Sequence, residues 1–218
     1  MLLAIDTATR IAGIALYNEN GLHAEHVWRT SDNHTMELMP CIVHACEQQT
    51  LRPAELEAVG VSLGPGSFTG LRVGLSIAKG LALALGIALM GVTTLDAAAH
   101  AHSRQCLPIC AVLPAGRGMW CTAFYSVVEG SCQRRSDYAL VNTATLIERL
   151  QEPTLICGEL DTRLREALRA DACGNAVVTS PAYAAQRAGF LAELAWRRFA
   201  CGERDDMTSL SPIYLQRT

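Results

Sequence analysis

Residues 63–72 read Leu-Gly-Pro-Gly-Ser-Phe-Thr-Gly-Leu-Arg, between an apolar run and a long helical pattern. This order predicts a strand over Ala58–Leu63, a tight loop, and a helix over Thr69–Leu85. Such a loop leaves backbone N–H groups unpaired, and the helix dipole favours a negatively charged group there. The loop residues that are candidates to face a nucleotide phosphate are Gly64, Gly66 and Ser67.

The same loop is equally consistent with a sharp strand-to-helix turn that binds nothing. It matches neither a phosphate loop that ends in Gly-Lys-Ser/Thr nor a Gly-x-Gly-x-x-Gly dinucleotide turn, and short glycine spacings are weak signals. Ser67 and Thr69 also fit a role as helix caps and nothing more. A nucleophilic serine has no support, because the loop around Ser67 is not a Gly-x-Ser-x-Gly elbow.

Composition limits the classes of protein that the chain can be. Its 218 residues, 50% of them hydrophobic, suffice for one large domain or two small ones with a core. With a net charge of -3, the chain lacks the excess of basic residues that is typical of a protein that binds nucleic acid by itself. Nine cysteines without Cys-x-x-Cys spacing favour a cytoplasmic protein with reduced thiols. Asp6 comes too early for a signal peptide, and the longest uncharged stretch, Gly80–Leu95, is shorter than the roughly 20 residues of a membrane span, so we expect no membrane association.

The first half of the chain predicts an antiparallel meander followed by strand–helix crossovers. Asn20-Gly21 is a strong hairpin signal, and alternating strands and helices after it predict a mixed sheet with helices on its faces. The predicted strands are Leu2–Ile5, Ile11–Tyr17, Leu22–Trp28, Ala58–Leu63 and Ile87–Val92. The predicted helices are His34–Gln49, Thr69–Leu85 and Thr94–His102.

Two of these helices carry extended apolar surfaces. In the first, with candidate N-caps at Ser31 and Asp32, apolar residues recur at i, i+3, i+4 and i+7 from Met39. Pro40 is expected to bend that helix or mark its first turn. The helix over Thr69–Leu85 is apolar on more than one side, so it is either a central core helix or a helix with a partner on its second side.

The second half has weaker patterns. We place the domain boundary near Ser103–Leu107, giving domains 1–104 and 105–218, with the last helix free to pack back on the first domain. The tail Leu210–Gln216 has no periodicity. The predicted strands are Leu107–Val112, Met119–Val128, Tyr138–Val141, Leu155–Cys157 and Val177–Val178, and the helices are Thr143–Leu150, Asp161–Arg169 and Phe190–Cys201, the last beginning as early as Ala182.

Several motifs together resemble one family. They are Leu-Ala-Ile-Asp-Thr-Ala-Thr at 3–9, His-Thr at 34–35 with Leu38 and Pro40, Gly-Pro-Gly-Ser-Phe-Thr-Gly-Leu-Arg-Val-Gly at 64–74, Lys-Gly-Leu-Ala at 79–82, Gly-Val-Thr-Thr-Leu at 91–95 and Pro-Ile-Tyr-Leu at 212–215. The chain thereby resembles the TsaB (YeaZ) family, bacterial accessory proteins of tRNA threonylcarbamoyladenosine synthesis. The resemblance is dense over residues 1–100 and thin afterwards.

The resemblance implies an α/β fold of the actin-like ATPase (sugar kinase/heat-shock chaperone) superfamily, with two subdomains that each hold a mixed sheet flanked by helices. In nucleotide-binding members of that superfamily the first hairpin faces phosphate, which adds Asp6, Thr7 and Thr9 to the candidates. The resemblance also implies a heterodimer with a catalytic paralogue, TsaD, which transfers threonylcarbamoyl to the adenosine beside the tRNA anticodon. A TsaE-type ATPase joins the pair, with ATP or ADP in the complex and tRNA reached only through it.

Two departures argue against chemistry in this chain. The catalytic paralogue holds a metal through His-x-x-x-His on a helix, whereas the matching segment here runs from His34 to Leu38, so we expect no metal site and no catalytic residue. Family members usually carry Asp-Ala-Arg and Gly-Glu in the second half. Here Pro-Ala-Gly-Arg-Gly-Met stands from Pro114 to Met119, so we predict weak or no ATP binding by this chain alone.

The resulting hypothesis is a non-catalytic partner that docks through its two apolar helices and forms a homodimer when the partner is absent. An ATP-dependent small-molecule kinase or ATPase of the same fold is the alternative, and a peptidase is a remote one. The predicted interface residues are His34, Leu38, Met39, Ile42, Val43, Cys46, Val73, Ile77, Gly80, Leu81 and Ala84.

Overall fold

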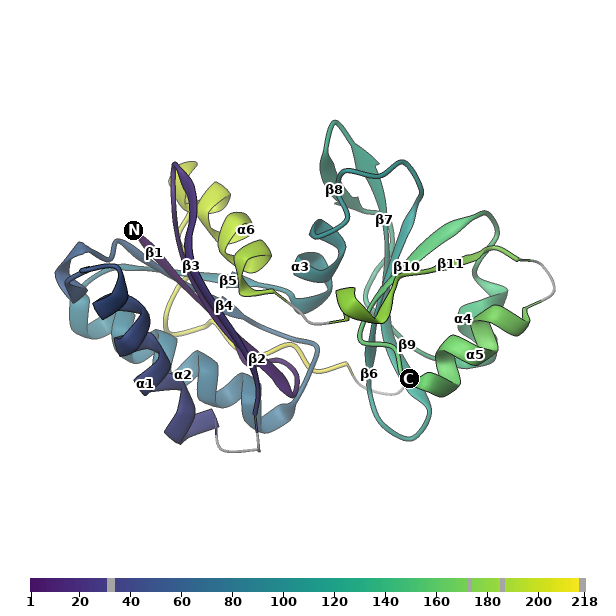
Figure 1. Ribbon diagram of the computed structural model, residues 1–218, viewed down its shortest axis with the longest axis horizontal. Coiled ribbons are helices and arrows are strands. Elements are labelled where there is room, and N and C mark those ends of the chain that lie inside the picture. The colour runs from purple at the N-terminus through teal and green to yellow at the C-terminus, as the bar shows by residue number, and fades with distance from the viewer. Residues whose placement is uncertain (31–33, 172–173, 185–186, 216–218) are drawn as a thin grey trace. The chain divides into compact units, whose positions relative to one another are not determined.

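The computed structural model describes residues 1–30, 34–171, 174–184 and 187–215, and the side chains at 34 and 35 lie outside that description. It contains two compact units, each with one mixed sheet flanked by helices (Figure 1). Unit 1 comprises Met1–Thr94 and Arg187–Ile213, and unit 2 comprises Leu95–Gln186 and Tyr214–Thr218. The predicted α/β class with two subdomains is confirmed.

The sheet of unit 1 has the strand order β3-β2-β1-β4-β5. Its first three strands form the predicted antiparallel meander, and β4 and β5 run parallel to β1. The predicted hairpin turn is present, with Asn18 paired to Gly21 and Gly21 at a φ of 109°. The strands are β1 (Leu2–Asp6), β2 (Ile11–Asn18), β3 (Gly21–Arg29), β4 (Ala58–Ser62) and β5 (Ala88–Val92).

Helices α1 (His34–Gln48) and α2 (Phe68–Leu85) cover one face of this sheet (Figure 1). Buried residues of both helices share one core cluster with β1, β2, β4 and β5, among them Leu38 and Leu75. Pro40 lies inside α1. The predicted caps Ser31 and Asp32 lie outside the described residues. A short 3₁₀ turn, Pro53–Glu55, connects α1 to β4.

The ends of α2 are defined by local chemistry. The Ser67 hydroxyl accepts a hydrogen bond from the Gly70 amide at 3.2 Å, and Gly86 ends the helix with a left-handed φ of 66°. By length and composition α2 could cross a membrane, and among the described residues it is the one helix that could. Six of its 18 residues are buried within the fold.

Helix α6 (Ala188–Ala200) covers the other face of the first sheet, so the last helix does pack back on the first half (Figure 1). It begins at Ala188, not as early as Ala182, because Pro181–Tyr183 forms a separate 3₁₀ turn. The helix approaches the sheet closely, since a Cβ added to Gly60 would lie 2.8 Å from the Ala195 Cβ.

The sheet of unit 2 repeats the arrangement of the first, in the order β11-β10-β6-β7-β8 with β9 paired to β7. Strand β8 has no counterpart among the predicted strands. The strands are β6 (Ile109–Pro114), β7 (Met119–Val128), β8 (Ser131–Arg134), β9 (Ala139–Asn142), β10 (Thr154–Gly158) and β11 (Ala176–Val178). Residues of α4 (Thr143–Glu148) and α5 (Thr162–Ala170) pack in one core cluster and those of α3 (Thr94–His100) in another.

The units divide the chain after Thr94, ten residues before the predicted cut at 104/105. The reason is the packing of α3, whose Leu95 and Ala99 belong to a core cluster with β6 and β7. The Asp96 carboxylate also accepts hydrogen bonds from the hydroxyls of Tyr125 at 2.7 Å and Tyr138 at 3.1 Å. These contacts assign α3 to unit 2.

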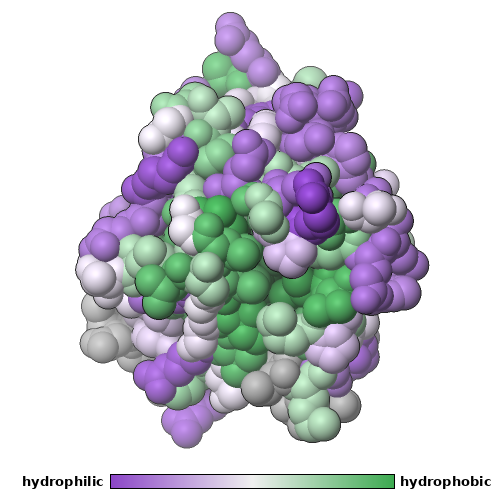
Figure 2. All heavy atoms as spheres, turned by 90° about the vertical axis from the view of Figure 1, so that its left-hand side faces the viewer, coloured by the Kyte–Doolittle hydropathy of each residue, from purple (hydrophilic) through white to green (hydrophobic). Residues whose placement is uncertain are grey.

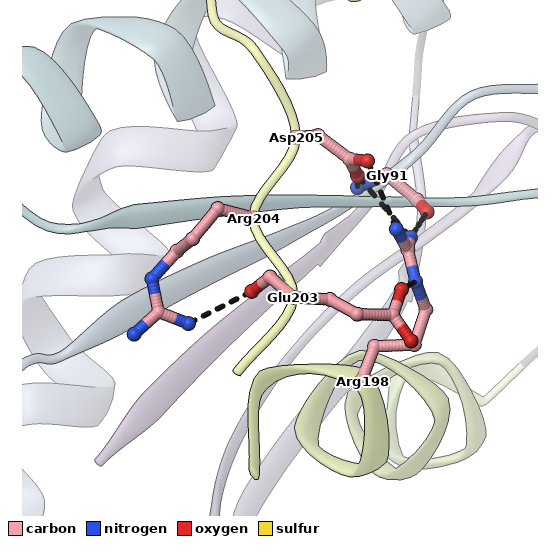
Figure 3. Close-up of polar contacts among 5 residues, drawn as sticks. All are labelled: Gly91, Arg198, Glu203, Arg204 and Asp205. Carbon is pink, nitrogen blue, oxygen red and sulfur yellow. Dashed lines mark hydrogen bonds and ion pairs between the residues drawn. The ribbon is translucent and has the colours of Figure 1, made fainter. Parts of the chain in front are cut away.

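After α6, residues 203–213 form a C-terminal strap that contacts β5 at Asp205 (Figure 3) and Leu63, the residue after β4, at Ile213. The Asp205 amide donates to the Leu89 carbonyl at 3.0 Å, and the Asp205 carboxylate accepts from the Gly91 amide at 2.6 Å. Arg198 of α6 donates to the Gly91 carbonyl at 2.6 Å and to Asp205 at 2.9 Å. The strap therefore satisfies backbone groups on the edge strand β5.

Candidate functional site

The structure brings the two predicted nucleotide-facing segments, the hairpin after β1 and the glycine loop, into direct contact. The Ser67 amide donates to the Ala8 carbonyl at 2.6 Å. Gly66 lies so close to the hairpin that an added Cβ would be 2.2 Å from the Ala8 oxygen. Gly64, at a φ of 97°, lies against Leu71 and the Ile213 carbonyl. The loop therefore packs on the hairpin at contact distance.

Thr7, the hairpin residue nearest to α2, is fully buried. Its hydroxyl donates to the Gly70 carbonyl at 2.7 Å, and its amide donates to the Ser62 hydroxyl at 3.2 Å. Gly74 makes room for this side chain, because a Cβ at that position would lie 2.2 Å from the Thr7 hydroxyl oxygen. The polar groups of Thr7 are thus used to join β1, β4 and α2.

Asp6 and Thr9 also bond within the hairpin. Asp6 is buried and accepts from the Ala8 amide at 3.0 Å. Burial raises the pKa of the Asp6 carboxyl above its ordinary value, against hydrogen bonds from Ala8 and Ser62 that lower it. The Thr9 hydroxyl accepts from the Ile11 amide at 3.0 Å. A phosphate at this hairpin stays a prediction.

In unit 2 the corresponding hairpin joins β6 to β7. The Ala115 amide donates to the Met119 carbonyl at 2.9 Å, and Gly116, Arg117 and Gly118 all have positive φ. Pro114 ends β6 as Asp6 ends β1, and its side chain is exposed and without a carboxylate. The departure seen in the sequence therefore lies where unit 1 has its buried aspartate.

The predicted interface residues of α1 divide between two environments. Leu38, Ile42 and Cys46 are at most 8% exposed and belong to the core cluster of unit 1. Met39 and Val43 are 38% and 49% exposed. The side chain of His34 lies outside the described residues. The Trp28 indole donates to the Glu37 carboxylate at 2.9 Å, which fixes α1 against β3.

The predicted interface residues of α2 lie away from the sheet-facing row of Leu71, Leu75, Ala78 and Ala82. Gly80 and Ala84 are exposed, whereas Val73, Ile77 and Leu81 are half-buried. Ile77 and Leu81 also pack against the core cluster, so only part of each side chain is exposed at the surface.

Three exposed large apolar residues of these helices were missing from the predicted set. Met36 is 77% exposed, Leu83 is 73% exposed, and Phe68, at the start of α2, is 54% exposed. Figure 2 shows hydrophobic side chains gathered in the middle of the side of the molecule on which α1 and α2 lie in Figure 1, with hydrophilic groups around them. We call this surface the apolar helix face, and it comprises Met36, Met39 and Val43 of α1 with Val73, Ile77, Gly80, Leu81, Leu83 and Ala84 of α2.

The helix segment that corresponds to the metal motif of the catalytic paralogue offers an apolar residue at its second position. Leu38 is fully buried in the core cluster. Across the part of the chain that the structure describes, no group of three or more His, Cys, Asp or Glu side chains is placed to hold a metal ion.

Comparison with known proteins gives the family. The family model for TsaD, described as tRNA N6-adenosine threonylcarbamoyltransferase, matches residues 27–185. The tRNA threonylcarbamoyladenosine biosynthesis protein TsaB of Bacillus subtilis (strain 168) is 32% identical over 177 residues, which cover 80% of this chain and 77% of that protein. The chain belongs to the TsaB family. TsaB of Escherichia coli (strain K12) is 36% identical over 104 residues, 48% of this chain and 45% of that protein.

The solved structures agree on the fold of this TsaB-family chain. YeaZ from Pseudomonas aeruginosa matches 98% of this chain and 99% of its own with a TM-score of 0.82. The two sequences are 23% identical, so this likeness concerns the fold alone. It extends over both units, including the half in which the sequence motifs are thin.

Proposed function

We propose that this chain acts in tRNA threonylcarbamoyladenosine biosynthesis as a non-catalytic partner that docks on a TsaD-type catalytic subunit and activates it. Family membership supports the pathway, and the apolar helix face supports docking. That face is the single observation that carries the proposal, because large apolar side chains exposed together on two helices mark an interaction surface. Burying one such side chain contributes about 1.5–3 kcal/mol.

The same face suits a second copy of the chain when the catalytic subunit is absent. Met36, Met39 and Val43 recur along α1 at helical spacing, and α2 lies beside α1, so two helices from each protomer would form a four-helix contact. Homodimer and heterodimer would then exclude one another.

We propose that nucleotide and tRNA bind the assembled complex and not this chain alone. The Thr7 and Thr9 hydroxyls and the Asp6 carboxylate are bonded within the protein, and Pro114 offers no metal ligand, which supports weak or no ATP binding by the chain alone. ATP or ADP, the TsaE-type ATPase and tRNA are proposed to bind the assembled complex. The net charge of -3 supports the proposal that the partner proteins make most of the electrostatic contacts to tRNA.

Docking is tested with a charge on the apolar helix face. Val43→Glu should abolish binding to the TsaD-type subunit, measured by calorimetry, and leave the circular dichroism spectrum unchanged, because Val43 is 49% exposed. Val128→Glu is the matched control, since Val128 is 39% exposed on unit 2. Retained binding by Val43→Glu would reject this surface.

Activation is tested by reconstituting tRNA modification from the catalytic subunit, the ATPase, the adenylate-forming enzyme, ATP, threonine, bicarbonate and tRNA. Modification should depend on this chain and should fail with Val43→Glu. Equal modification without the chain would overturn the proposal, and ATP hydrolysis by the chain alone would favour the kinase or ATPase alternative.

A further inference from the structure

Two methionines lie together on the apolar helix face. Met36 and Met39 are 77% and 38% exposed, and their i, i+3 spacing places them on the same side of α1. Val43, one turn further on, is 49% exposed and continues the row. The α1 half of the proposed docking surface is therefore built largely from thioether side chains.

The other described methionines are more protected. Met90 is fully buried in β5, and Met1 and Met207 pack against the core cluster of unit 1. Met119 is half-buried at the start of β7. Because methionine oxidation follows exposure of the sulfur, an oxidant in solution should reach Met36 and Met39 first.

The thiols of α1 are poor competitors for the same oxidant. Cys41 is half-buried and Cys46 is buried. Burial, joined by the nearby Glu37 carboxylate, raises the pKa of Cys41, and burial raises that of Cys46. Since the thiolate is the reactive form of cysteine, both react slowly, whereas a thioether needs no deprotonation.

We propose that Met36 and Met39 are reversible oxidation sites, at which a peroxide-class oxidant switches off docking through the apolar helix face. In the reaction the thioether sulfur attacks one oxygen of hydrogen peroxide and the O–O bond breaks. The sulfur is oxidised to a sulfoxide, and the other oxygen leaves as water. The polar sulfoxide replaces an apolar contact at the surface, and methionine sulfoxide reductases reverse the change. This inference rests on the proposed docking function.

The test treats the full chain, diluted until size-exclusion chromatography shows a monomer, with limiting hydrogen peroxide. Catalase then quenches the peroxide, and dithiothreitol reduces oxidised thiols. Peptide mass spectrometry should find sulfoxide at Met36 and Met39 well before Met90 and Met207. Binding to the TsaD-type subunit should weaken at least tenfold and return after treatment with methionine sulfoxide reductases. The double variant Met36→Leu/Met39→Leu should bind normally before peroxide treatment and keep its binding afterwards. The control Met207→Leu should bind normally before treatment and lose binding after it, as the wild type does.

Three outcomes would overturn the inference. One is oxidation of both methionines with unchanged binding. Another is an equal loss of binding in the double leucine variant, which would place the effect at residues other than Met36 and Met39. The third is failure of the untreated chain to bind, which removes the proposed docking itself and is distinguished by its occurrence before any peroxide is added.

Discussion

Gly74 and Gly80 occupy the same helix and serve different purposes. An added Cβ at Gly74 would lie 2.2 Å from the Thr7 hydroxyl oxygen, whereas a Cβ at Gly80 would meet nothing within 4 Å. Gly74 is required by the approach of the hairpin to α2. Gly80 lies on the exposed side of α2, where open space surrounds its Cα.

This difference predicts opposite effects of one substitution. Gly74→Ala should lower the free energy of unfolding by about 1–3 kcal/mol, because the Thr7 contact is with a buried, hydrogen-bonded group. Gly80→Ala should raise it by about 0.5–1 kcal/mol through helix propensity. Urea unfolding of the two variants measures both, and equal shifts would contradict the assignment of Gly74 to the hairpin contact.

The residues of α1 show which part of the predicted interface the sequence pattern could not resolve. The periodicity of α1 correctly indicates an amphipathic helix, but it combines Leu38, Ile42 and Cys46, which are core residues, with the exposed Met39 and Val43. The apolar stripe of α1 is wider than its contact with the core, so part of the stripe is buried and part is exposed. The sequence spacing alone does not say which residues are buried. Burial in the folded unit separates them.

At the scale of elements, the C-terminal strap is held by one arginine and one aspartate. Arg198 donates to Asp205, to the Gly91 carbonyl and to Glu203, so a single guanidinium joins α6, β5 and the strap (Figure 3). Burial raises the pKa of Asp205, but the Arg198 and Gly91 hydrogen bonds outweigh it and hold that pKa below its ordinary value.

The sign of this shift gives a pH prediction. Because the carboxylate has a lower pKa in the folded chain than the value of about 3.9 expected when unfolded, it stabilises the fold above about pH 4. Its contribution is lost as the pH falls through the folded pKa. Asp205→Asn should therefore cost about 1–2 kcal/mol at pH 7 and progressively less below pH 4.

Urea unfolding at several pH values, with hydrogen exchange of the Gly91 amide, checks this prediction. Asp137→Asn, at an exposed position on unit 2, serves as the control. A cost of Asp205→Asn that stays constant down to pH 3 would show that the strap does not depend on the charge.

The strap also explains a failure of pattern reasoning. The tail Leu210–Gln216, which overlaps the strap, has no periodicity because its described residues form no helix or strand. Isolated contacts position it, such as the Ile213 amide that donates to the Leu63 carbonyl at 2.7 Å. Strand β8 escapes prediction for a related reason, since Ser131–Arg134 is short and polar and is ordered by pairing with β7. Elements with their own hydrophobic period, such as α2 and β4, are predicted within a residue.

At the scale of the whole molecule, unit 1 is discontinuous in sequence. Its sheet comes from residues 1–94, but the helix on its second face comes from residues 188–200. Ala188, Leu191, Ala192 and Ala195 of α6 are all fully buried. Without this helix the sheet would expose one entire face to water.

The corresponding prediction concerns fragments. Residues 1–94 alone should fail to unfold cooperatively, because one face of the sheet lacks its cover. Co-expression with a peptide of residues 187–213 should restore a cooperative thermal transition and a dispersed NMR spectrum. A fragment 1–94 that is well folded by itself would contradict the assignment of α6 to the core of unit 1.

The repeated strand order of the two sheets has a consequence for how a recognition surface arises. Helix α2 connects β4 to β5 in unit 1, and helix α5 connects β10 to β11, the matching pair of strands in unit 2. Helix α2 has 18 residues and α5 has 9, so α2 is longer by about 13.5 Å at 1.5 Å per residue. The two sheets therefore share one strand order, while the helices at the matching position present surfaces of very different length.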